Sequence, residues 1–429
     1  MDFLIAEEGS GYKLTWPQIN VEVKVSRIRN RKDGIKAECQ FWLQGSGRHR
    51  SNFFMDSDNQ VAACVRGLQE KLPEQDYLGG TKWSSIIHDL TGVIIDKVRA
   101  GTPEISLGDF WNEREDENLW RVDNLLVNDV NVLWADGGSG KSYFALFLAT
   151  LISEGAEYAN SDHGLLVQPG NVLFLDYETN YRSIVQRLRK IHRGLGIERA
   201  TRIVYRKQST AIVDDVDELT NMVYRNNIDV IVVDSMGLAV AGELESQETV
   251  SEFFRVLKSI CETTLVITHS NKAGFIFGSI YTQNHARSVW QAEKQAGSLA
   301  DKSIDFTLMH RKANDIAVQP MQSWSVNFED EDVVYTRIET IDTGSAGQLS
   351  YKKLVLELLK KKAGQTREDL IEQISQLKEE HSDKSRPNVR SAVSSLKEGG
   401  RVSEDDGRLS LKEGELWNNN TEPTLELEI

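Results

Sequence analysis

The chain has 429 residues, which is too long for one ordinary hydrophobic core and predicts two or three domains. Its 40% apolar and 27% charged residues are typical of a soluble globular protein. The net charge of -15 argues against a protein that coats duplex DNA with Lys and Arg, so we expect any nucleic-acid contact to be local.

Several further classes are disfavoured by the sequence. No apolar run approaches the ~20 residues of a membrane-spanning helix. The acidic N-terminus lacks the character of a signal peptide. Cys39, Cys64 and Cys261 are far apart and odd in number, which argues against disulfides and a zinc cluster. We therefore expect a cytoplasmic protein without a membrane partner.

Residues 1–98 predict a small α+β domain. Val21, Val23 and Val25 alternate with polar residues, as does the stretch Ile35–Leu43, and a turn sequence at 30–34 separates the two runs. This pattern predicts a β-hairpin. Helical patterns follow over Val61–Leu72 and Lys82–Val98.

The hairpin region combines basic with aromatic side chains. The basic ones are Arg27, Arg29, Arg31, Lys32, Lys36, Arg48 and Arg50, and the aromatic ones are Phe41, Trp42, Phe53 and Phe54. Such a mixture can bind single strands by charge and base stacking. The alternative is a solvated hairpin over an ordinary aromatic core.

A glycine-rich motif follows a charged linker at 99–118. Residues Ala135–Ser142 have the Walker A spacing and lie between an apolar run and a helical pattern. Glycines let the backbone take positive φ and bring N–H groups against phosphate oxygens, while Lys141 approaches the β- and γ-phosphates and Ser142 reaches Mg²⁺. We therefore predict binding of ATP with Mg²⁺. The residues expected to hold the nucleotide are Asp136, Gly137, Gly138, Ser139, Gly140, Lys141, Ser142 and Tyr143.

Strands and helices alternate after this motif, which predicts a parallel sheet with crossover helices over residues 119–345. The predicted strands are Asn171–Asp176, Ile203–Tyr205, Asp229–Ser235 and Thr264–His269, and the predicted helices are Tyr181–Ile191, Val216–Arg225 and Val250–Ile260. Antiparallel edge strands are expected at Phe306–His310, Trp324–Asn327 and Val333–Ile338.

Polar residues stand where several of these strands end, at the sheet edge that binds ligands. Asp234 follows four apolar residues, the Walker B pattern, and is expected to hold Mg²⁺ together with Ser142. Glu178 or Asp176 could activate the attacking water, and the other reading of Glu178 is a first-turn helix residue. His269 could sense the γ-phosphate or be an ordinary polar strand end.

These features resemble the RecA/DnaB-like ATPases, and within them the RepA-type branch of plasmid and phage hexameric helicases. The motifs that carry the resemblance are Ala135–Ser142, Leu175–Glu178 with Arg187-Leu188, Val233–Ser235, Thr268-His269, Gly278-Ser279, Asn284–Trp290 and Arg311–Asn314.

The resemblance implies residue roles and an assembly. It favours Glu178 as the catalytic base, assigns His269 as the sensor, and makes Lys312 or Arg311 a finger that enters the neighbouring subunit's site. The other reading of Lys312 is an exposed strand lysine. A finger acting on a neighbour requires a ring, so the expectation is a homo-hexamer.

In this family the segments after the Walker B and sensor strands face single-stranded DNA. Here they are Met236–Thr249 and Ser270–Gln283, with Lys272 and Arg287 as the candidate contacts. The first segment departs from expectation because it carries three glutamates and no basic residue.

Residues 346–413 predict a winged helix. A first helix carries the stripe Leu354–Leu359, a capping box at Thr366–Asp369 opens a second, and Pro387 is expected at the start of a third. A hairpin turn at 405–407 would form the wing. Candidate DNA contacts are Arg386, Arg390, Arg401 and Arg408, and the alternative is a protein-docking module. Residues 414–429 predict a disordered acidic tail.

The function predicted from the sequence is an ATP-driven motor on single-stranded DNA, namely a replicative DNA helicase of a phage or mobile element. The alternative is a non-translocating ATPase switch that loads or regulates DNA-bound partner proteins.

Overall fold

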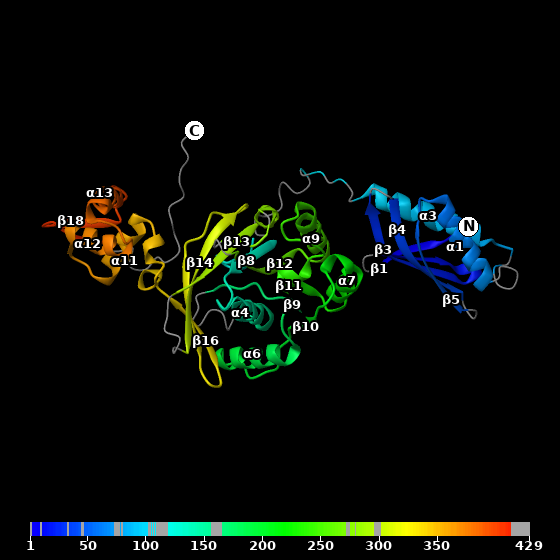
Figure 1. Ribbon diagram of the computed structural model, residues 1–429, viewed down its shortest axis with the longest axis horizontal. Coiled ribbons are helices and arrows are strands. Elements are labelled where there is room, and N and C mark those ends of the chain that lie inside the picture. Colours follow the sequence, from blue (N-terminus) through cyan, green and yellow to red (C-terminus); the bar gives the residue numbers. More distant parts are fainter. Residues whose placement is uncertain are drawn as a thin grey trace.

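The computed structural model describes residues 2–8, 11–31, 34–43, 47–72, 78, 80–101, 104, 106, 108, 119–155, 165–271, 275–278, 280–295 and 302–412. These residues form an N-terminal, a central and a C-terminal unit that follow one another along the long axis of Figure 1. One hydrophobic core lies in each terminal unit, and two lie on the faces of the central sheet. Among the described helices, none combines the length and apolar character needed to cross a bilayer.

The N-terminal unit is a five-stranded antiparallel sheet in the order β1-β2-β3-β4-β5, with two helices against one face. The predicted hairpin is present as β3 and β4, whereas the sequence did not predict β1, β2 or β5. The elements are β1 Leu4–Glu8, β2 Gly11–Trp16, β3 Val21–Arg31, β4 Gly34–Leu43, β5 Gly47–Phe54, α1 Asp58–Lys71 and α3 Trp83–Ala100, with a short helix η1 at Pro17–Ile19.

The central unit is built on a nine-stranded sheet in the order β10-β9-β11-β12-β8-β13-β14-β15-β16. The first six strands are parallel and the last three are antiparallel to their neighbours. The strands are β8 Val130–Ala135, β9 Asn171–Asp176, β10 Val204–Lys207, β11 Ile228–Asp234, β12 Thr263–His269, β13 Ser288–Lys294, β14 Ser303–Ala313, β15 Gln322–Phe328 and β16 Val333–Ile338, and a separate small ribbon pairs β6 Trp120–Val122 with β7 Leu126–Val127.

Helices cover both faces of this sheet. The core of one face contains residues of α4 and α6, and the core of the other contains residues of α7 and α9. The helices are α4 Lys141–Glu154, α6 Tyr181–Gly194, α7 Val216–Arg225, α8 Met236–Ala239, α9 Gln247–Ile260 and α10 Tyr281–His285, with short 3-10 turns at Ile212–Asp214, Thr340–Asp342 and Ala346–Gln348. The fold is thus the expected mixed α/β arrangement, in which the carboxyl ends of the parallel strands share one edge.

The C-terminal unit contains three helices and a three-stranded sheet in the order β17-β19-β18. Its elements are α11 Tyr351–Lys361, β17 Gln365–Thr366, α12 Arg367–Leu377, α13 Ser382–Glu398, β18 Val402–Asp405 and β19 Arg408–Leu411. The Thr366 capping box is present. Asp406 and Gly407 both have positive φ, 47° and 73°, as a two-residue hairpin turn of type I′ requires.

The predicted start of the third helix is wrong. Helix α13 begins at Ser382, and Pro387 lies inside it. The helix can begin earlier because Nδ1 of His381 accepts the backbone N–H of Asp383 at 3.4 Å, which satisfies one of the first free donors. The side chain of Asn388 also donates to the Lys384 carbonyl at 3.2 Å in the same turns.

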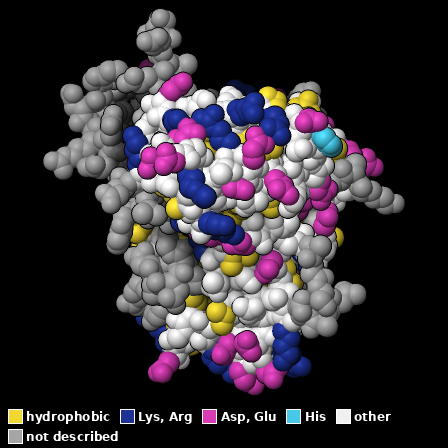
Figure 2. Space-filling view, turned by 90° about the vertical axis from the view of Figure 1, so that its left-hand side faces the viewer, with side chains coloured by type: hydrophobic (Ala, Val, Ile, Leu, Met, Phe, Trp, Pro, Cys, Tyr) yellow, Lys and Arg dark blue, Asp and Glu magenta, His cyan; other side chains and the backbone are white. Residues whose placement is uncertain are grey.

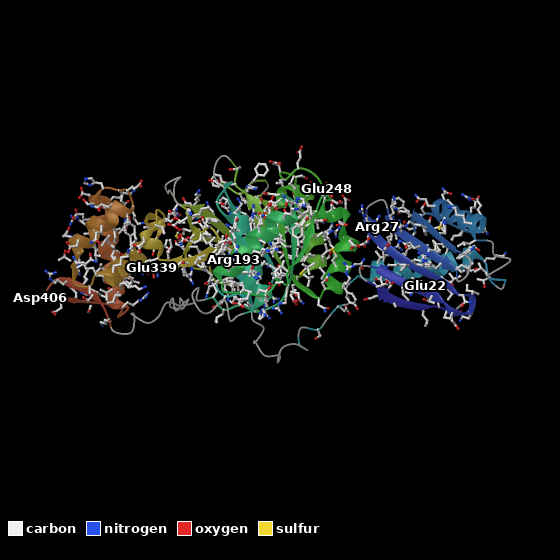
Figure 3. All side chains as sticks on the ribbon, turned by 90° about the horizontal axis from the view of Figure 1, so that it is seen from below. Glu22, Arg27, Arg193, Glu248, Glu339 and Asp406 are labelled. Atoms are coloured by element: carbon white, nitrogen blue, oxygen red, sulfur yellow. The ribbon has the colours of Figure 1, made fainter. Side chains whose placement is uncertain are left out.

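Ion pairs join the N-terminal unit to the central one. Arg27 lies 3.8 Å from Asp217, and Arg29 lies 3.6 Å from Asp214. Figure 3 shows Arg27 on the side of the N-terminal unit that faces the central unit. These two members of the predicted basic cluster are therefore directed toward the rest of the chain.

Candidate active site

The loop between β8 and α4 has the geometry of a phosphate cradle. Gly138 and Gly140 have φ of 70° and 87°, which non-glycine residues rarely adopt. A Cβ added to Gly137, Gly138 or Gly140 would meet no atom within 4 Å, so the loop borders open space. The hydroxyl of Ser139 is buried without a hydrogen-bond partner among the described residues. The free N–H groups at the start of α4 complete a site that fits an anion.

Lys141 spans the mouth of this loop. Its Nζ donates to the carbonyl oxygens of Ala135 at 2.9 Å and Asp136 at 2.7 Å. Burial lowers the pKa of Lys141, while the carboxylates of Asp234, Glu178 and Asp136 act in the opposite direction. Three carboxylates around this buried ammonium favour its charged form. The residues thus fit a nucleotide triphosphate, whose oxygens would replace the loop carbonyls as partners of Nζ.

Asp234 and Ser142 meet beside the start of α4. Burial raises the pKa of Asp234 to about 6, the hydrogen bond from Ser142 opposes the shift, and the charges of Glu178 and Asp176 add to it. A buried carboxylate with a raised pKa favours a cation beside it. No group of three or more His, Cys, Asp or Glu among the described residues could hold a metal ion. A hydroxyl and one carboxylate fit Mg²⁺, which takes its other ligands from phosphate and water.

The two carboxylates at the end of β9 have different surroundings. Asp176 is buried and accepts hydrogen bonds from the Glu178 and Thr179 backbone N–H groups, the Thr179 hydroxyl and the Tyr205 hydroxyl, all within 2.9 Å. Burial would raise the pKa of Asp176, but these hydrogen bonds outweigh it and the pKa is lowered. Asp176 therefore holds the turn, and its weakened basicity makes it a poor proton acceptor.

Glu178 instead faces the site with its side chain 35% exposed. Its Oε1 accepts a hydrogen bond from the Ser235 hydroxyl at 2.5 Å and lies 3.4 Å from Nε2 of His269. The structure thus brings together Glu178, Ser235 and His269 from the ends of three neighbouring strands. Ser235 received no role from the sequence, although its place directly after the Walker B aspartate was the available signal.

His269 connects the carboxylate to the phosphate loop. Its Nδ1 lies 3.4 Å from Nζ of Lys141, and its Nε2 faces Glu178. A lysine ammonium can only donate, so Nδ1 is the acceptor and Nε2 carries the proton toward the carboxylate. The next residue, Ser270, donates its hydroxyl to the Asp136 carboxylate. The end of β12 therefore touches both halves of the candidate site.

The comparisons with known proteins agree with this geometry. Residues 101–274 match the family model of an AAA domain. This part of the chain is therefore similar to AAA-domain ATPases. No curated protein matches the sequence.

Three solved structures similar to the chain are a helicase, a KaiC-like protein and a flagellar accessory protein. One is a DnaB-like replicative helicase, with 13% identity over 65% of this chain and 75% of that one, at a TM-score of 0.39. A KaiC-like protein of Pyrococcus horikoshii OT3 has 15% identity over 50% and 93%, at 0.34. The flagellar accessory protein FlaH of Methanocaldococcus jannaschii has 11% identity over 49% and 90%, at 0.33.

Tyr143 lies in the first turn of α4, and its ring packs against neighbouring elements. The guanidinium of Arg187 lies 4.9 Å from the centre of the Tyr143 ring, and Phe328 packs edge-on at 5.2 Å. The ring is thus committed to packing α4 against α6 and β15. Its N–H group remains at the first turn of α4, where the sequence placed a nucleotide contact.

The two finger candidates lie on β14, away from the phosphate loop of the same ATPase domain. Lys312 pairs in register with Val289 of β13, which pairs with Val132 inside β8. The Lys312 Nζ donates to three backbone carbonyls around the end of α10, those of Gln283, Asn284 and Ala286, at 2.7 to 3.1 Å. Burial, followed by the charge of Arg287, lowers its pKa. Lys312 is therefore engaged as a helix cap in this structure.

Arg311 is the freer candidate. It is exposed, and its Nε donates to the Gln291 side chain at 2.8 Å. Among the described residues, no hydrogen bond or ion pair joins Arg311 or Lys312 to the Lys141–Glu178 cluster. A role in hydrolysis would thus have to be played in another subunit.

The candidate DNA contacts of the ATPase domain have mixed outcomes. Lys272 lies outside the described residues. Arg287 lies 3.5 Å from Asp129 and 3.9 Å from Asp315, so its charge is largely balanced. The glutamates at 243, 245 and 248 are exposed, and Figure 3 shows Glu248 at the surface of the central unit. The three glutamates noted in the sequence therefore lie on the surface of the central unit.

The arginines of the C-terminal unit are also partly paired. Arg386 and Arg390 share Glu368, at 2.7 and 3.6 Å. Arg408 donates to the carbonyl of Gly364 at 3.0 Å, and Arg401 also has an interaction partner. Figure 2, which faces this end of the molecule, shows acidic side chains among the basic ones. The unit does not present a continuous basic surface among its described residues.

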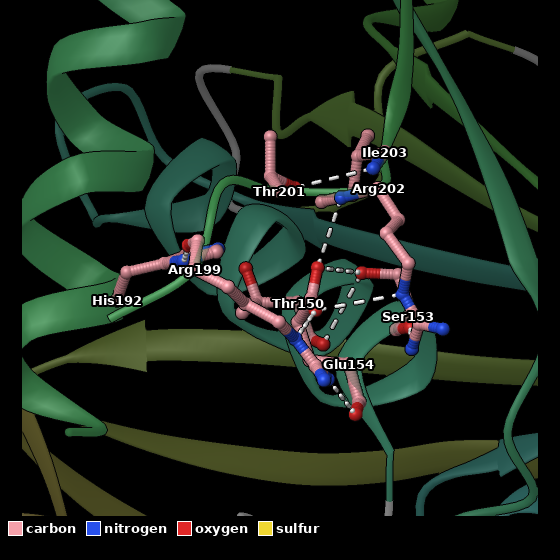
Figure 4. A network of polar contacts seen from close by, with 8 residues as sticks. All are labelled: Thr150, Ser153, Glu154, His192, Arg199, Thr201, Arg202 and Ile203. Atoms are coloured by element: carbon pink, nitrogen blue, oxygen red, sulfur yellow. Dashed lines mark hydrogen bonds and ion pairs between the residues drawn. The ribbon is translucent and has the colours of Figure 1, made fainter. Parts of the chain in front are cut away.

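The far end of α4 is anchored by Glu154, whose side chain is 0% exposed (Figure 4). Its carboxylate accepts from Nε of Arg199 at 2.8 Å and from the backbone N–H of Arg202 at 3.0 Å. Burial would raise the pKa of Glu154, but the hydrogen bonds from Arg202 and Arg199 lower it overall. Since Arg199 and Arg202 follow α6, this network fixes α4 to the segment that Glu178 precedes.

Proposed function

We propose that the protein is an ATP-hydrolysing, ring-forming motor on single-stranded DNA, namely a replicative DNA helicase of a phage or mobile element. The observation that carries the hydrolytic part is the cluster of Glu178, Ser235, His269 and Lys141 at the carboxyl edge of the sheet. A base, a hydrogen-bonded orienting group and a cation within one cluster are what water activation beside a phosphate requires.

Each residue has a distinct task in this proposal. Glu178 accepts the proton of the attacking water, and Ser235 holds its Oε1 in place. Lys141 and the N–H groups of the 137–143 turn bind the phosphate oxygens. Ser142 and Asp234 would hold Mg²⁺, which supplies positive charge to the transferred phosphoryl group. His269 links the state of the phosphate site to Glu178.

Assembly into a ring, most simply a hexamer, is part of the proposal. It is supported by the position of Arg311, which is exposed on β14, two strands from β8, and has no hydrogen bond or ion pair to its own phosphate loop among the described residues. A finger that stabilises the transition state from a neighbouring subunit typically accelerates hydrolysis about 10³- to 10⁵-fold. Sedimentation with a non-hydrolysable ATP analogue tests this part, and monomers alone would contradict it.

The acidic surface around Glu243, Glu245 and Glu248 favours a second candidate, a non-translocating ATPase switch that loads or regulates DNA-bound partners. In either case we propose that residues 346–413 act as a winged helix. The sharing of Glu368 by two arginines favours protein docking over duplex binding for this unit.

The decisive experiment measures ATP hydrolysis with and without single-stranded DNA, together with strand separation on a forked duplex. Wild type should be stimulated by the single strand and should separate strands, whereas Glu178→Gln should lose about 10²- to 10⁴-fold in turnover. Glu329→Gln, on an exposed turn, is the matched control and should behave like wild type. Hydrolysis without DNA stimulation or unwinding would favour the switch, and full turnover in Glu178→Gln would refute the assigned base.

A further inference from the structure

The basic and aromatic residues of the N-terminal unit separate into three groups in the structure. Phe41 and Phe53 are buried beneath the helices, at 0% and 3% exposure. Arg27 and Arg29 face the central unit, as described above. The remaining described members lie on the sheet face opposite α1 and α3, and we name them the outer face: Lys36, Trp42, Arg48, Arg50 and Phe54.

The outer face pairs each aromatic ring with a cation across β4 and β5. Trp42 lies opposite Arg48 in the strand register, and the guanidinium is 5.9 Å from the ring centre. Lys36 lies opposite Phe54, with its Nζ 5.3 Å from that ring. Both rings are partly exposed. The two pairs stand six residues apart along β4, which corresponds to about 20 Å.

The outer face as a whole carries excess positive charge, because Lys36, Arg48 and Arg50 surround one carboxylate, Glu38. Arg50 has its side chain 64% exposed and lies 3.0 Å from Glu38. Glu38 is only 6% exposed and is also 3.5 Å from Arg27, so its carboxylate is neutralised within the face. On β1 to β3 two lysines each have a glutamate of their own, Lys13 with Glu22 and Lys24 with Glu8, whereas the three cations of the outer face lie around one carboxylate. The chain as a whole has a net charge of -15, so this positive surface is a local feature.

We propose that the outer face binds single-stranded DNA, independently of nucleotide. Trp42 and Phe54 offer stacking surfaces to bases, and Lys36, Arg48 and Arg50 offer charge to the phosphates between them. Strand β5 is the last strand of its sheet, so a single strand can run past its open edge. Duplex DNA fits poorly because its bases are already stacked and paired.

The test measures binding of a fluorescein-labelled oligothymidylate to the full-length protein, without nucleotide, by fluorescence anisotropy. The variant Trp42→Leu keeps an apolar side chain but removes the stacking surface, and it should weaken binding about tenfold. Trp42→Phe keeps an aromatic ring and should restore most of the affinity. Both sites are at the surface, and thermal unfolding checks that each variant remains folded.

The salt dependence reports the phosphate contacts. The double variant Arg48→Gln with Arg50→Gln should reduce the slope of log affinity against log salt by about 1.4, since each phosphate contact contributes about 0.7 on a single strand. The control is Lys13→Gln with Lys24→Gln, which removes the same charge from the acid-paired strands and should leave the slope unchanged. A control that lowers the slope equally would overturn the proposal.

Two other results would overturn it: equal binding of a matched duplex, or unchanged affinity in Trp42→Leu. The proposal is separable from the proposed function. Glu178→Gln should bind the oligonucleotide like wild type, and Trp42→Leu should hydrolyse ATP like wild type in the absence of DNA. Loss of unwinding with an intact outer face would therefore count against the motor alone.

Discussion

Replacing Ser235 by alanine tests the organisation of the active site most directly. The Ser235 hydroxyl donates to Glu178 at 2.5 Å, a short distance typical of a hydrogen bond to a charged oxygen. Such a bond contributes about 1.5–3 kcal/mol. If it is needed to orient the carboxylate in the transition state, its loss corresponds to roughly a 10- to 150-fold lower rate.

The remaining contacts of Glu178 set the expected size of the effect. In Ser235→Ala the carboxylate keeps, among its contacts with described residues, the longer one to His269 at 3.4 Å. We expect kcat to fall into the range above while KM for ATP stays within about twofold, because Ser235 is no part of the phosphate loop. Ser235→Thr keeps the hydroxyl and should recover most of the activity.

Steady-state hydrolysis with saturating Mg²⁺ measures both constants. Ser259→Ala, which removes a hydroxyl from the exposed surface of α9, is the matched control. Turnover of Ser235→Ala within twofold of wild type would refute the positioning role. A large rise in KM with unchanged kcat would show that the residue supports nucleotide binding instead.

Three further predictions address the finger, the buried network and pH. Arg311→Ala should lower the rate of ATP hydrolysis by about 10³-fold. Mixing it with Glu178→Gln subunits should restore turnover, because the first variant supplies the catalytic base and the second supplies the arginine. No recovery of turnover would contradict action between subunits. Glu154→Gln should lower the free energy of unfolding by about 2–3 kcal/mol, because it removes the buried negative charge that pairs with Arg199. Urea unfolding measures this change. Glu198→Gln, at an exposed position, is the control. Burial lowers the pKa of His310 to about 4, below its usual 6.5. Between these two values the unfolded state binds more protons than the native state. The free energy of unfolding therefore decreases as the pH falls from about 6.5 to 4. The loss attributable to this residue is about 3 kcal/mol. His310→Asn, which cannot titrate there, should flatten that part of the pH profile, and an unchanged profile would contradict the assignment.

The parts of the site that consecutive residues encode were predictable. Strand β8, the phosphate loop and Asp234 form continuous sequence patterns, because a buried parallel strand is a short apolar run and its carboxyl end binds ligands. The edge strand β5 was not predicted, because its sequence, GRHRSNFF, has too few apolar residues to show the alternation of apolar and polar side chains that indicates a strand. Strand β13 was read only as part of a motif, although it joins the parallel and antiparallel halves of the sheet.

Contacts between distant residues were beyond the sequence alone. Ser235 and Glu178 are 57 positions apart, and only the pairing of β11 with β9 places them together. Lys312 was expected to be a finger or an exposed lysine, and neither expectation included the helix α10 that it caps. The choice between Glu178 and Asp176 likewise depended on hydrogen bonds that no spacing rule provides.

The Glu154 network has a consequence for how a signal could leave the nucleotide site. Helix α4 starts at the phosphate loop, and α6 starts just after Glu178. Glu154 at the end of α4 holds Arg199 and Arg202 of the segment that follows α6, and these contacts oppose movement of α4 relative to that segment. His269 and Ser270, at the end of β12, contact Lys141, Glu178 and Asp136. If the site holds a nucleotide, as proposed, loss of its γ-phosphate would therefore be expected to change first the contacts of His269 and Ser270 at the end of β12.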